Sequence, residues 1–208
     1  MRVPVAPEGW PFIFPTAAAA GILAVMGWWA VAAVVAVLAA AFVGFFRDPD
    51  RTAPVAPGAL LAPADGRVTE ITAVDDGWVG PAVRMSIFLS PLDVHVNRAP
   101  AAGLVRDVEW MRGRFRAAYR SEASEVNERC TVALEGDASR VAVRQIAGVL
   151  ARRIVCRVRR GDKLDAGQRF GLIRFGSRTD LIAPRGVDVR VSVGDRVRGG
   201  ESIMAILR

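Results

Sequence analysis

The chain has 208 residues, of which 52% are hydrophobic and 24% charged, and its formal net charge is +7. A disordered chain would be poorer in hydrophobic residues, and this length allows one modest domain with an appendage. One histidine and two cysteines are too few for most zinc sites and for a disulfide framework, so we expect no metal. The excess positive charge favours an anionic partner, either nucleic acid or anionic lipid.

An uncharged apolar stretch near the N-terminus favours lipid. Residues 9–46 carry no charge, and the 31 residues of 16–46 exceed the roughly 20 that one spanning helix needs. Trp28 and Trp29 lie near the middle, and tryptophan prefers the membrane interface. Two alternatives follow: one long tilted helix, or a hairpin of two short helices that turns near these tryptophans. A secretory signal peptide fits less well, because the apolar run is longer than its usual core.

The apolar stretch ends at Phe46, and Arg47 and Arg51 follow within five residues. Arginines at this end favour a cytoplasmic position for the rest of the chain. We therefore expect a membrane-associated segment at residues 1–51, attached peripherally or monotopically to the cell membrane, and a separate body at residues 52–208.

The body is predicted to be mainly β, in the α+β class. Runs of strand length that alternate or are continuously apolar are separated by turn-forming residues. The clearest runs are 66–72, 82–89, 141–146 and 154–158. The polar segment 112–126 predicts instead a mobile loop or a surface strand.

An internal echo suggests a more specific architecture. The pattern Gly-Asp-basic-aliphatic-x-small-Gly occurs at residues 161–167 and again at 194–200, 33 residues later. Gly-Asp favours a tight turn, and the second glycine a bend between short strands. The pair resembles the hammerhead turns of lipoyl- and biotinyl-type barrel-sandwich folds, with two unrelated turns as the alternative.

Three short elements carry chemistry. Asp65 lies in a Pro-Ala-Asp-Gly turn before a strand, and His95, the only histidine, follows an apolar strand in the run 90–98. Histidine at such a place is a candidate general acid or base. Gly176 and Ser177 follow the apolar run 170–173. The Ser177 hydroxyl could attack the Gly176 carbonyl through a five-membered ring, which would leave an ester in the backbone.

In this order the motifs Leu-Ala-Pro-Ala-Asp-Gly, Ser-Pro-Leu-Asp-Val-His-Val-Asn-Arg and Phe-Gly-Ser-Arg-Thr-Asp resemble those of phosphatidylserine decarboxylases. The resemblance is to the short bacterial and archaeal class, and it covers nearly the whole chain. It implies a proenzyme that cleaves itself into a β chain, 1–176, and an α chain, 177–208, which stay together as a heterodimer. Ser177 would become a covalent pyruvoyl group, without any external cofactor.

The same resemblance implies that the pyruvoyl ketone forms a Schiff base with phosphatidylserine in an anionic membrane. Carbon dioxide leaves, and phosphatidylethanolamine is released. It also implies roles for individual residues. His95 would donate or accept the proton, and Asp65 would be associated with activation of Ser177. Longer members carry a second histidine where this chain has Arg98, so a full Asp-His-Ser relay does not carry over.

Three further residues and two rival functions are also compatible with the sequence. Asn127, Glu128 and Arg98 could contact the headgroup. A membrane-anchored biotinyl- or lipoyl-like carrier would need Lys163, the only lysine, as its modified residue. An archaetidylserine decarboxylase would share the serine headgroup but not the lipid tails. The sequence leaves the tail type, a higher oligomer and the activator of Ser177 open.

Overall fold

The computed structural model describes residues 4–114, 116, 123–136, 140–148, 153–174 and 177–207. The chain forms two compact units, residues 1–50 and 51–208.

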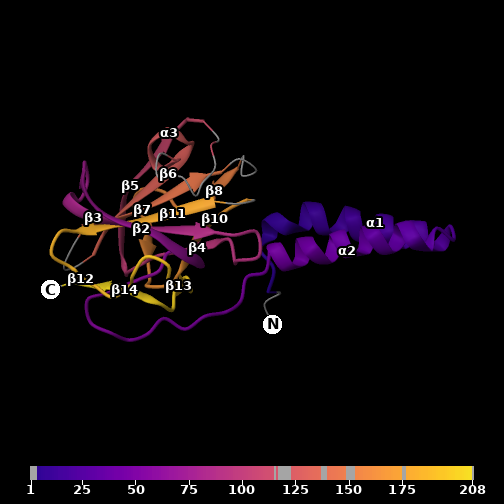
Figure 1. Cartoon of the computed structure of the whole chain (residues 1–208), viewed down its shortest axis with the longest axis horizontal. Helices are drawn as coiled ribbons and strands as arrows, with labels where there is room; N and C mark the ends of the chain where they lie inside the picture. The colour runs from indigo at the N-terminus through magenta and orange to yellow at the C-terminus, as the bar shows by residue number, and fades with distance from the viewer. Residues whose placement is uncertain are drawn as a thin grey trace. The chain divides into compact units, whose positions relative to one another are not determined.

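The first unit is a helical hairpin. After a 3-10 turn, η1 (Pro7–Gly9), helix α1 (Trp10–Val25) is followed by α2 (Trp29–Phe45), and the two run side by side (Figure 1). Gly27 permits the reversal, because its φ of 81° lies in the left-handed region that glycine tolerates. Of the two alternatives for this stretch, the structure has the hairpin.

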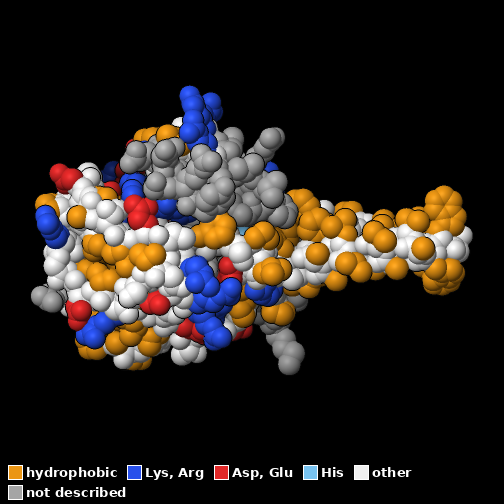
Figure 2. All heavy atoms as spheres, viewed as in Figure 1, with side chains coloured by type: hydrophobic (Ala, Val, Ile, Leu, Met, Phe, Trp, Pro, Cys, Tyr) orange, Lys and Arg blue, Asp and Glu red, His pale blue; other side chains and the backbone are white. Residues whose placement is uncertain are grey.

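The hairpin exposes apolar side chains on its outer surface (Figure 2). Val25 is 90% exposed and Trp29 71%, whereas a helix in a water-soluble unit would turn such residues to a core. The helical stretch 7–25 is long and apolar enough to cross a membrane by length and composition, and α2 is apolar but shorter. These properties are typical of membrane-associated helices.

The second unit is mainly β, as predicted. Its strands are β1 (Ala59–Leu61), β2 (Gly66–Asp76), β3 (Gly80–Leu89), β4 (Val96–Arg98), β5 (Gly103–Met111), β6 (Arg129–Glu135), β7 (Arg140–Ala147), β8 (Ile154–Cys156), β9 (Lys163–Leu164), β10 (Arg169–Ile173), β11 (Ser177–Pro184), β12 (Asp188–Val189), β13 (Arg196–Val197) and β14 (Ile203–Ile206). The segment predicted as a loop or surface strand contains a short helix, α3 (Ala123–Val126), and residues 115 and 117–122 of it lie outside the described residues.

The strands form a curled eight-stranded sheet in the order β13-β2-β3-β11-β7-β6-β5-β9 and two three-stranded sheets, β1-β14-β12 and β4-β10-β8. The paired strands are antiparallel, and the large sheet curls (Figure 1). One of its faces covers the main hydrophobic core. Met85 and Ile87 of β3 and Val143 of β7 belong to this core.

The two echoed turns are structurally equivalent, which gives the body its barrel-sandwich character. Gly194 N donates to Val68 O, and Gly161 N donates to Val105 O, both at 2.8 Å. Each turn therefore bonds to a strand that begins with the same pattern, Ala-Pro-Ala-x-Gly-x-Val, at 62–68 and at 99–105.

Strand β11 lies at the centre of the large sheet, between β3 and β7. Its first four residues are polar, yet all are buried. Because side chains alternate along a strand, Ser177 and Thr179 share the face of Leu181, which is in the main core. Arg178 and Asp180 lie on the opposite face.

A buried ion network satisfies that opposite face. Arg178 Nε donates to Asp180 Oδ1 at 2.8 Å, and its Nη2 donates to Glu70 Oε2 at 2.7 Å and Ser86 Oγ at 2.5 Å. Ser124 Oγ donates to the second Asp180 oxygen at 2.7 Å. Removing one partner of such a pair would leave an uncompensated charge, so the network holds the start of β11 in register.

Glu70 bridges this network to a second arginine. Burial acts to raise the pKa of Glu70, but hydrogen bonds from Arg178 and Arg84 outweigh it and hold the pKa below its ordinary value of 4.5. The folded carboxyl thus binds its proton less readily than the unfolded one. Its ionisation stabilises the fold above the ordinary pKa, and this contribution is lost as pH falls through the lowered value.

We predict that Glu70→Gln lowers the melting temperature most near neutral pH. The gap from the native protein should narrow as the pH falls below 4.5 and close once the pH passes the lowered pKa of the folded carboxyl, because the native carboxyl is then protonated too. Thermal unfolding of the full chain between pH 7 and pH 3 measures this. Glu109→Gln, at an exposed position, is the control and should show no such gap. A Glu70→Gln gap that stays constant across the range would contradict the prediction.

Candidate active site

Ser177 begins β11 and pairs with Leu89 of β3 and Ala147 of β7. Its side chain is fully buried, and Oγ has no hydrogen-bond partner among the described residues. A buried hydroxyl without a partner costs about 1–3 kcal/mol. Packing alone does not explain a serine here, which makes it a candidate for chemistry. Gly176, its expected partner in cleavage, lies outside the described residues.

His95 is also buried, with 2% of its surface exposed. Its Nδ1 lies 2.9 Å from the carbonyl oxygen of Asp93. Because a carbonyl oxygen can only accept, this contact places a proton on Nδ1. Nε2 is then the ring nitrogen at which a proton can be gained or lost.

The strand register brings the His95 and Ser177 segments together. Leu89, at the start of the connection to His95, is opposite Ser177, and Ile173 N donates to His95 O at 3.3 Å. Leu89 and His95 therefore lie next to Ser177 and Ile173, respectively. His95 and Ser177, both predicted from the sequence, therefore lie in the same region of the fold.

Two buried amide side chains connect β4, which begins directly after His95, to β11. Asn97 Nδ2 donates to Thr179 Oγ1 at 3.0 Å, and Gln145 Nε2 donates to Asn97 Oδ1 at 2.8 Å. Thr179 lies two residues after Ser177 and so shares its face. Sequence reasoning missed Gln145 and Thr179. Two features of the sequence could have indicated them: Gln145 is an amide in the largely apolar run 141–147, and Thr179 carries a hydroxyl two residues after Ser177.

Asp65 lies elsewhere. Both of its carboxylate oxygens accept from the Arg51 guanidinium, at 2.6 and 2.7 Å, and Oδ1 also accepts from Gly199 N at 2.8 Å. The carboxylate therefore fixes the turn 194–200 to residue 51. β2 begins after Asp65 and lies two strands from β11, which is about 10 Å at ordinary strand spacing. The described contacts do not join this carboxylate to Ser177.

Arg98, at the position where the resemblance implies a second histidine in longer family members, has 2% of its surface exposed. Its Nη1 donates to Gly167 O at 3.1 Å, and a Cβ on Gly200 would lie 2.7 Å from its Cδ. Gly200 thus makes room for the arginine stem. The side chain contacts both echoed turns, which is a structural role.

Asn127 and Glu128, considered for headgroup contact, brace the end of β7. Asn127 Nδ2 donates to Ala147 O at 2.7 Å and to Arg116 O at 2.8 Å. Ala147 N in turn donates to Glu128 O at 3.0 Å. Since Ala147 is the register partner of Ser177, these contacts fix the backbone beside the serine.

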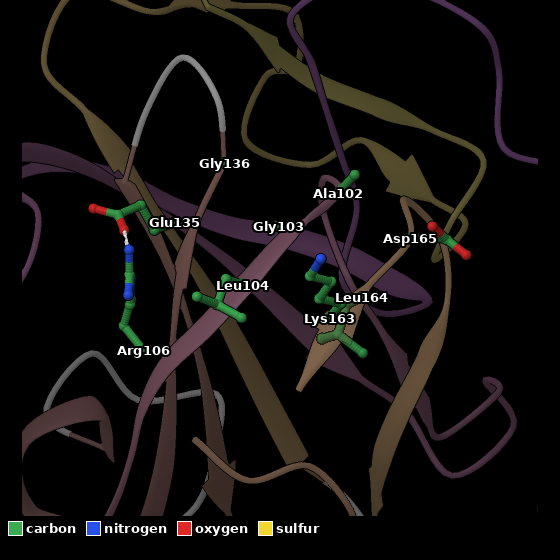
Figure 3. A pocket seen from close by; sticks show the side chains of 9 residues that line it. All are labelled: Ala102, Gly103, Leu104, Arg106, Glu135, Gly136, Lys163, Leu164 and Asp165. Carbon is green, nitrogen blue, oxygen red and sulfur yellow. Dashed lines mark hydrogen bonds and ion pairs between the residues drawn. The ribbon is translucent and has the colours of Figure 1, made fainter. Parts of the chain in front are cut away.

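A cavity of about 480 Å³ lies at the edge of the large sheet, and Figure 3 shows its lining. Lys163 lies in it on the short strand β9, beside the edge of β5, while Arg106 turns toward Glu135 and pairs with it. The lysine of a biotinyl or lipoyl carrier occupies a hairpin tip, which Lys163 does not. Apart from Lys163, which only the rival carrier function requires, no sequence-predicted site residue lines this cavity.

Comparisons with known proteins agree with the motifs. A family model described as phosphatidylserine decarboxylase matches residues 38–205. A curated relative from Symbiobacterium thermophilum, named phosphatidylserine decarboxylase proenzyme, is 47% identical over 100% of this chain and 98% of its own. Relatives of the same name from Oleidesulfovibrio alaskensis and Nocardia farcinica are 42% and 47% identical, covering 97% and 98% of this chain and 93% and 88% of theirs. The chain therefore belongs to the phosphatidylserine decarboxylase family.

Proposed function

We propose that this protein is a self-processing phosphatidylserine decarboxylase, a carboxy-lyase that releases carbon dioxide from phosphatidylserine and yields phosphatidylethanolamine. The observation that carries the proposal is the buried hydroxyl of Ser177, without a described partner at the head of the central strand. Membership of the family supports it independently.

Self-cleavage uses the chain's own atoms. Ser177 Oγ bonds to the Gly176 carbonyl carbon, the peptide C–N bond breaks, and the hydroxyl proton passes to the released amine. Loss of the Ser177 Cα proton then breaks the Cβ–Oγ bond. Gly176 leaves as a carboxylate, and a dehydroalanine remains. Water hydrolyses its imine tautomer, ammonia leaves, and the smaller chain begins with a pyruvoyl group.

The ketone of that group would supply an electrophile for the serine amine and a sink for the electron pair that carbon dioxide leaves behind. The surroundings of Ser177 fit such a group. The position is fully buried, so water is excluded, and the Thr179, Asn97 and Gln145 layer lies on the same face. His95 would donate or accept the proton, with the Asp93 carbonyl orienting its ring.

Asp65 is retained as a proposed contributor to cleavage, through the backbone that it fixes. Its carboxylate joins Arg51 to the turn 194–200, which belongs to the smaller chain. Arg98, Asn127 and Glu128 would support the site through the neighbouring backbone.

We also propose the domain organisation and location. Residues 1–51 would attach the protein to the cell membrane, and residues 52–208 would form a cytoplasmic catalytic domain of two chains, 1–176 and 177–208. The uncharged hairpin and the arginines after it support this arrangement. Strand pairing would keep the chains together, because β11 lies between β3 and β7 of the larger chain.

We predict that denaturing mass spectrometry of the purified protein reveals two chains divided between 176 and 177. The smaller chain should begin with a pyruvoyl group and resist Edman degradation. Ser177→Ala should stay intact and release no carbon dioxide from phosphatidylserine, because no ester can form. Ser192→Ala, at an exposed serine, is the control and should cleave normally. An unmodified Ser177 in active protein, or cleavage of Ser177→Ala, would overturn the proposal.

We predict that His95→Gln slows carbon dioxide release by at least about 100-fold per pyruvoyl group, the usual scale of general acid–base catalysis. Mass spectrometry counts the pyruvoyl groups, so a defect in cleavage is separated from a defect in turnover. An unchanged rate per pyruvoyl group would exclude His95 as the proton carrier of the decarboxylation step.

A further inference from the structure

We propose that the turn Ser90–Asp93 inserts into the membrane surface and presents the opening of the active site to the bilayer. This inference rests on the proposed function, because it concerns how a two-chain lipid reaches Ser177. The occupant of the surface is the interfacial layer of an anionic membrane.

The turn presents a rigid apolar tip. Asp93 N donates to Ser90 O at 2.9 Å, and Ser90 N donates to Asp93 Oδ2 at 2.8 Å, so both ends of the turn are fixed. Pro91 and Leu92 form the tip and are exposed, Leu92 by 83%. A single exposed leucine is ordinary on a protein surface, so its position in the fold decides its meaning.

That position is the rim of the candidate site. The turn follows Leu89, the register partner of Ser177, and precedes His95 by two residues. Ser177, which would carry the electrophile, therefore lies beside one end of the connection that carries the tip, and His95, which would move the proton, lies at the other end.

Arginines lie at the same end of the sheet. Arg114 and Arg116 bond through their backbones to residues 126–128, next to the Asn127 that holds Ala147. Arg153 accepts through its carbonyl oxygen from Arg174 N, one residue beyond the bond between Ile173 and His95.

The side chains of Arg114, Arg116 and Arg153 are exposed. Asp93 and the half-buried Glu128 are acidic neighbours, and Asp93 is bonded to Ser90. An apolar tip among exposed arginines matches an interface of acyl chains and anionic headgroups.

The substrate makes such contact necessary. Each methylene moved from the bilayer into water is unfavourable, so a two-chain lipid keeps its tails in the membrane while it reacts. The serine headgroup extends only slightly beyond the phosphate. Because Ser177 is fully buried, the rim around it must enter the headgroup layer before the serine amine can reach that position.

The first experiment compares two substrates. Turnover of long-chain phosphatidylserine in vesicles requires the protein to contact the membrane, whereas turnover of dihexanoyl phosphatidylserine below its micelle concentration does not. We expect Leu92→Glu to lower the ratio of vesicle to dispersed turnover at least tenfold. Gly77→Glu is the matched control, because Gly77 lies at the β2–β3 hairpin tip, at the opposite end of β3, with open space around it. Its ratio should stay within twofold of the native ratio.

An unchanged ratio for Leu92→Glu, or an equal fall for Gly77→Glu, would overturn the assignment of the tip. Native protein that decarboxylates neither substrate would refute the proposed function. Membrane insertion of the tip is then tested by a second measurement, which does not require enzymatic activity. A fluorophore is attached at Leu92→Cys or at Gly77→Cys in full-length Ser177→Ala, Cys156→Ala protein in vesicles. Cys130 is fully buried and escapes labelling.

Doxyl-labelled lipids should quench the label at position 92, and aqueous iodide the label at position 77. Quenching of both positions by iodide alone would overturn the inference.

Discussion

Burial of a polar strand end at the centre of a sheet is the constraint on which the rest of the structure depends. The first four residues of β11 are polar and have no access to water. Their two faces are treated differently. Arg178 and Asp180 neutralise each other within a network that includes Glu70, whereas Ser177 keeps a hydroxyl without a described partner. The ion network offsets the free-energy cost of burying Arg178 and Asp180, whereas the Ser177 hydroxyl next to it is left available for reaction.

The sheet topology makes breakage of the chain before β11 compatible with a folded body. The part after Ser177 contributes β11, β12, β13 and β14, and three of these pair with earlier strands: β11 with β3 and β7, β13 with β2, and β14 with β1. The turn 194–200 adds the Asp65 contact at Gly199. Cutting one covalent bond leaves these hydrogen bonds and the core between them in place, so the proposed two-chain product would keep the register of the proenzyme.

Much of this architecture was readable from the sequence, where local patterns determine local structure. The strand runs and the echoed turns follow from motifs. What the sequence could not supply is long-range pairing. Gln145 bonds to Asn97 across 48 residues, and Arg178 bonds to Glu70 across 108. The repeat at 62–68 and 99–105 was visible but gains meaning only from the turns to which it bonds.

Hydrogen bonding of β11 to its neighbours limits how a substrate can reach Ser177, which lies at the start of that strand. β11 is paired along both edges, so neither β3 nor β7 leaves a lateral path to Ser177. The connection that carries Leu92 and His95 begins at Leu89, the residue opposite Ser177, and so lies at the same end of the strand. A water-soluble substrate could diffuse to that end of the sheet, whereas a two-chain lipid would keep its tails in the bilayer while it reacts. If the turn 90–93 docks on the membrane as proposed, the same end of the sheet would exclude water from the serine and contact the bilayer, which would account for buried polar groups and an exposed leucine within a few residues of each other.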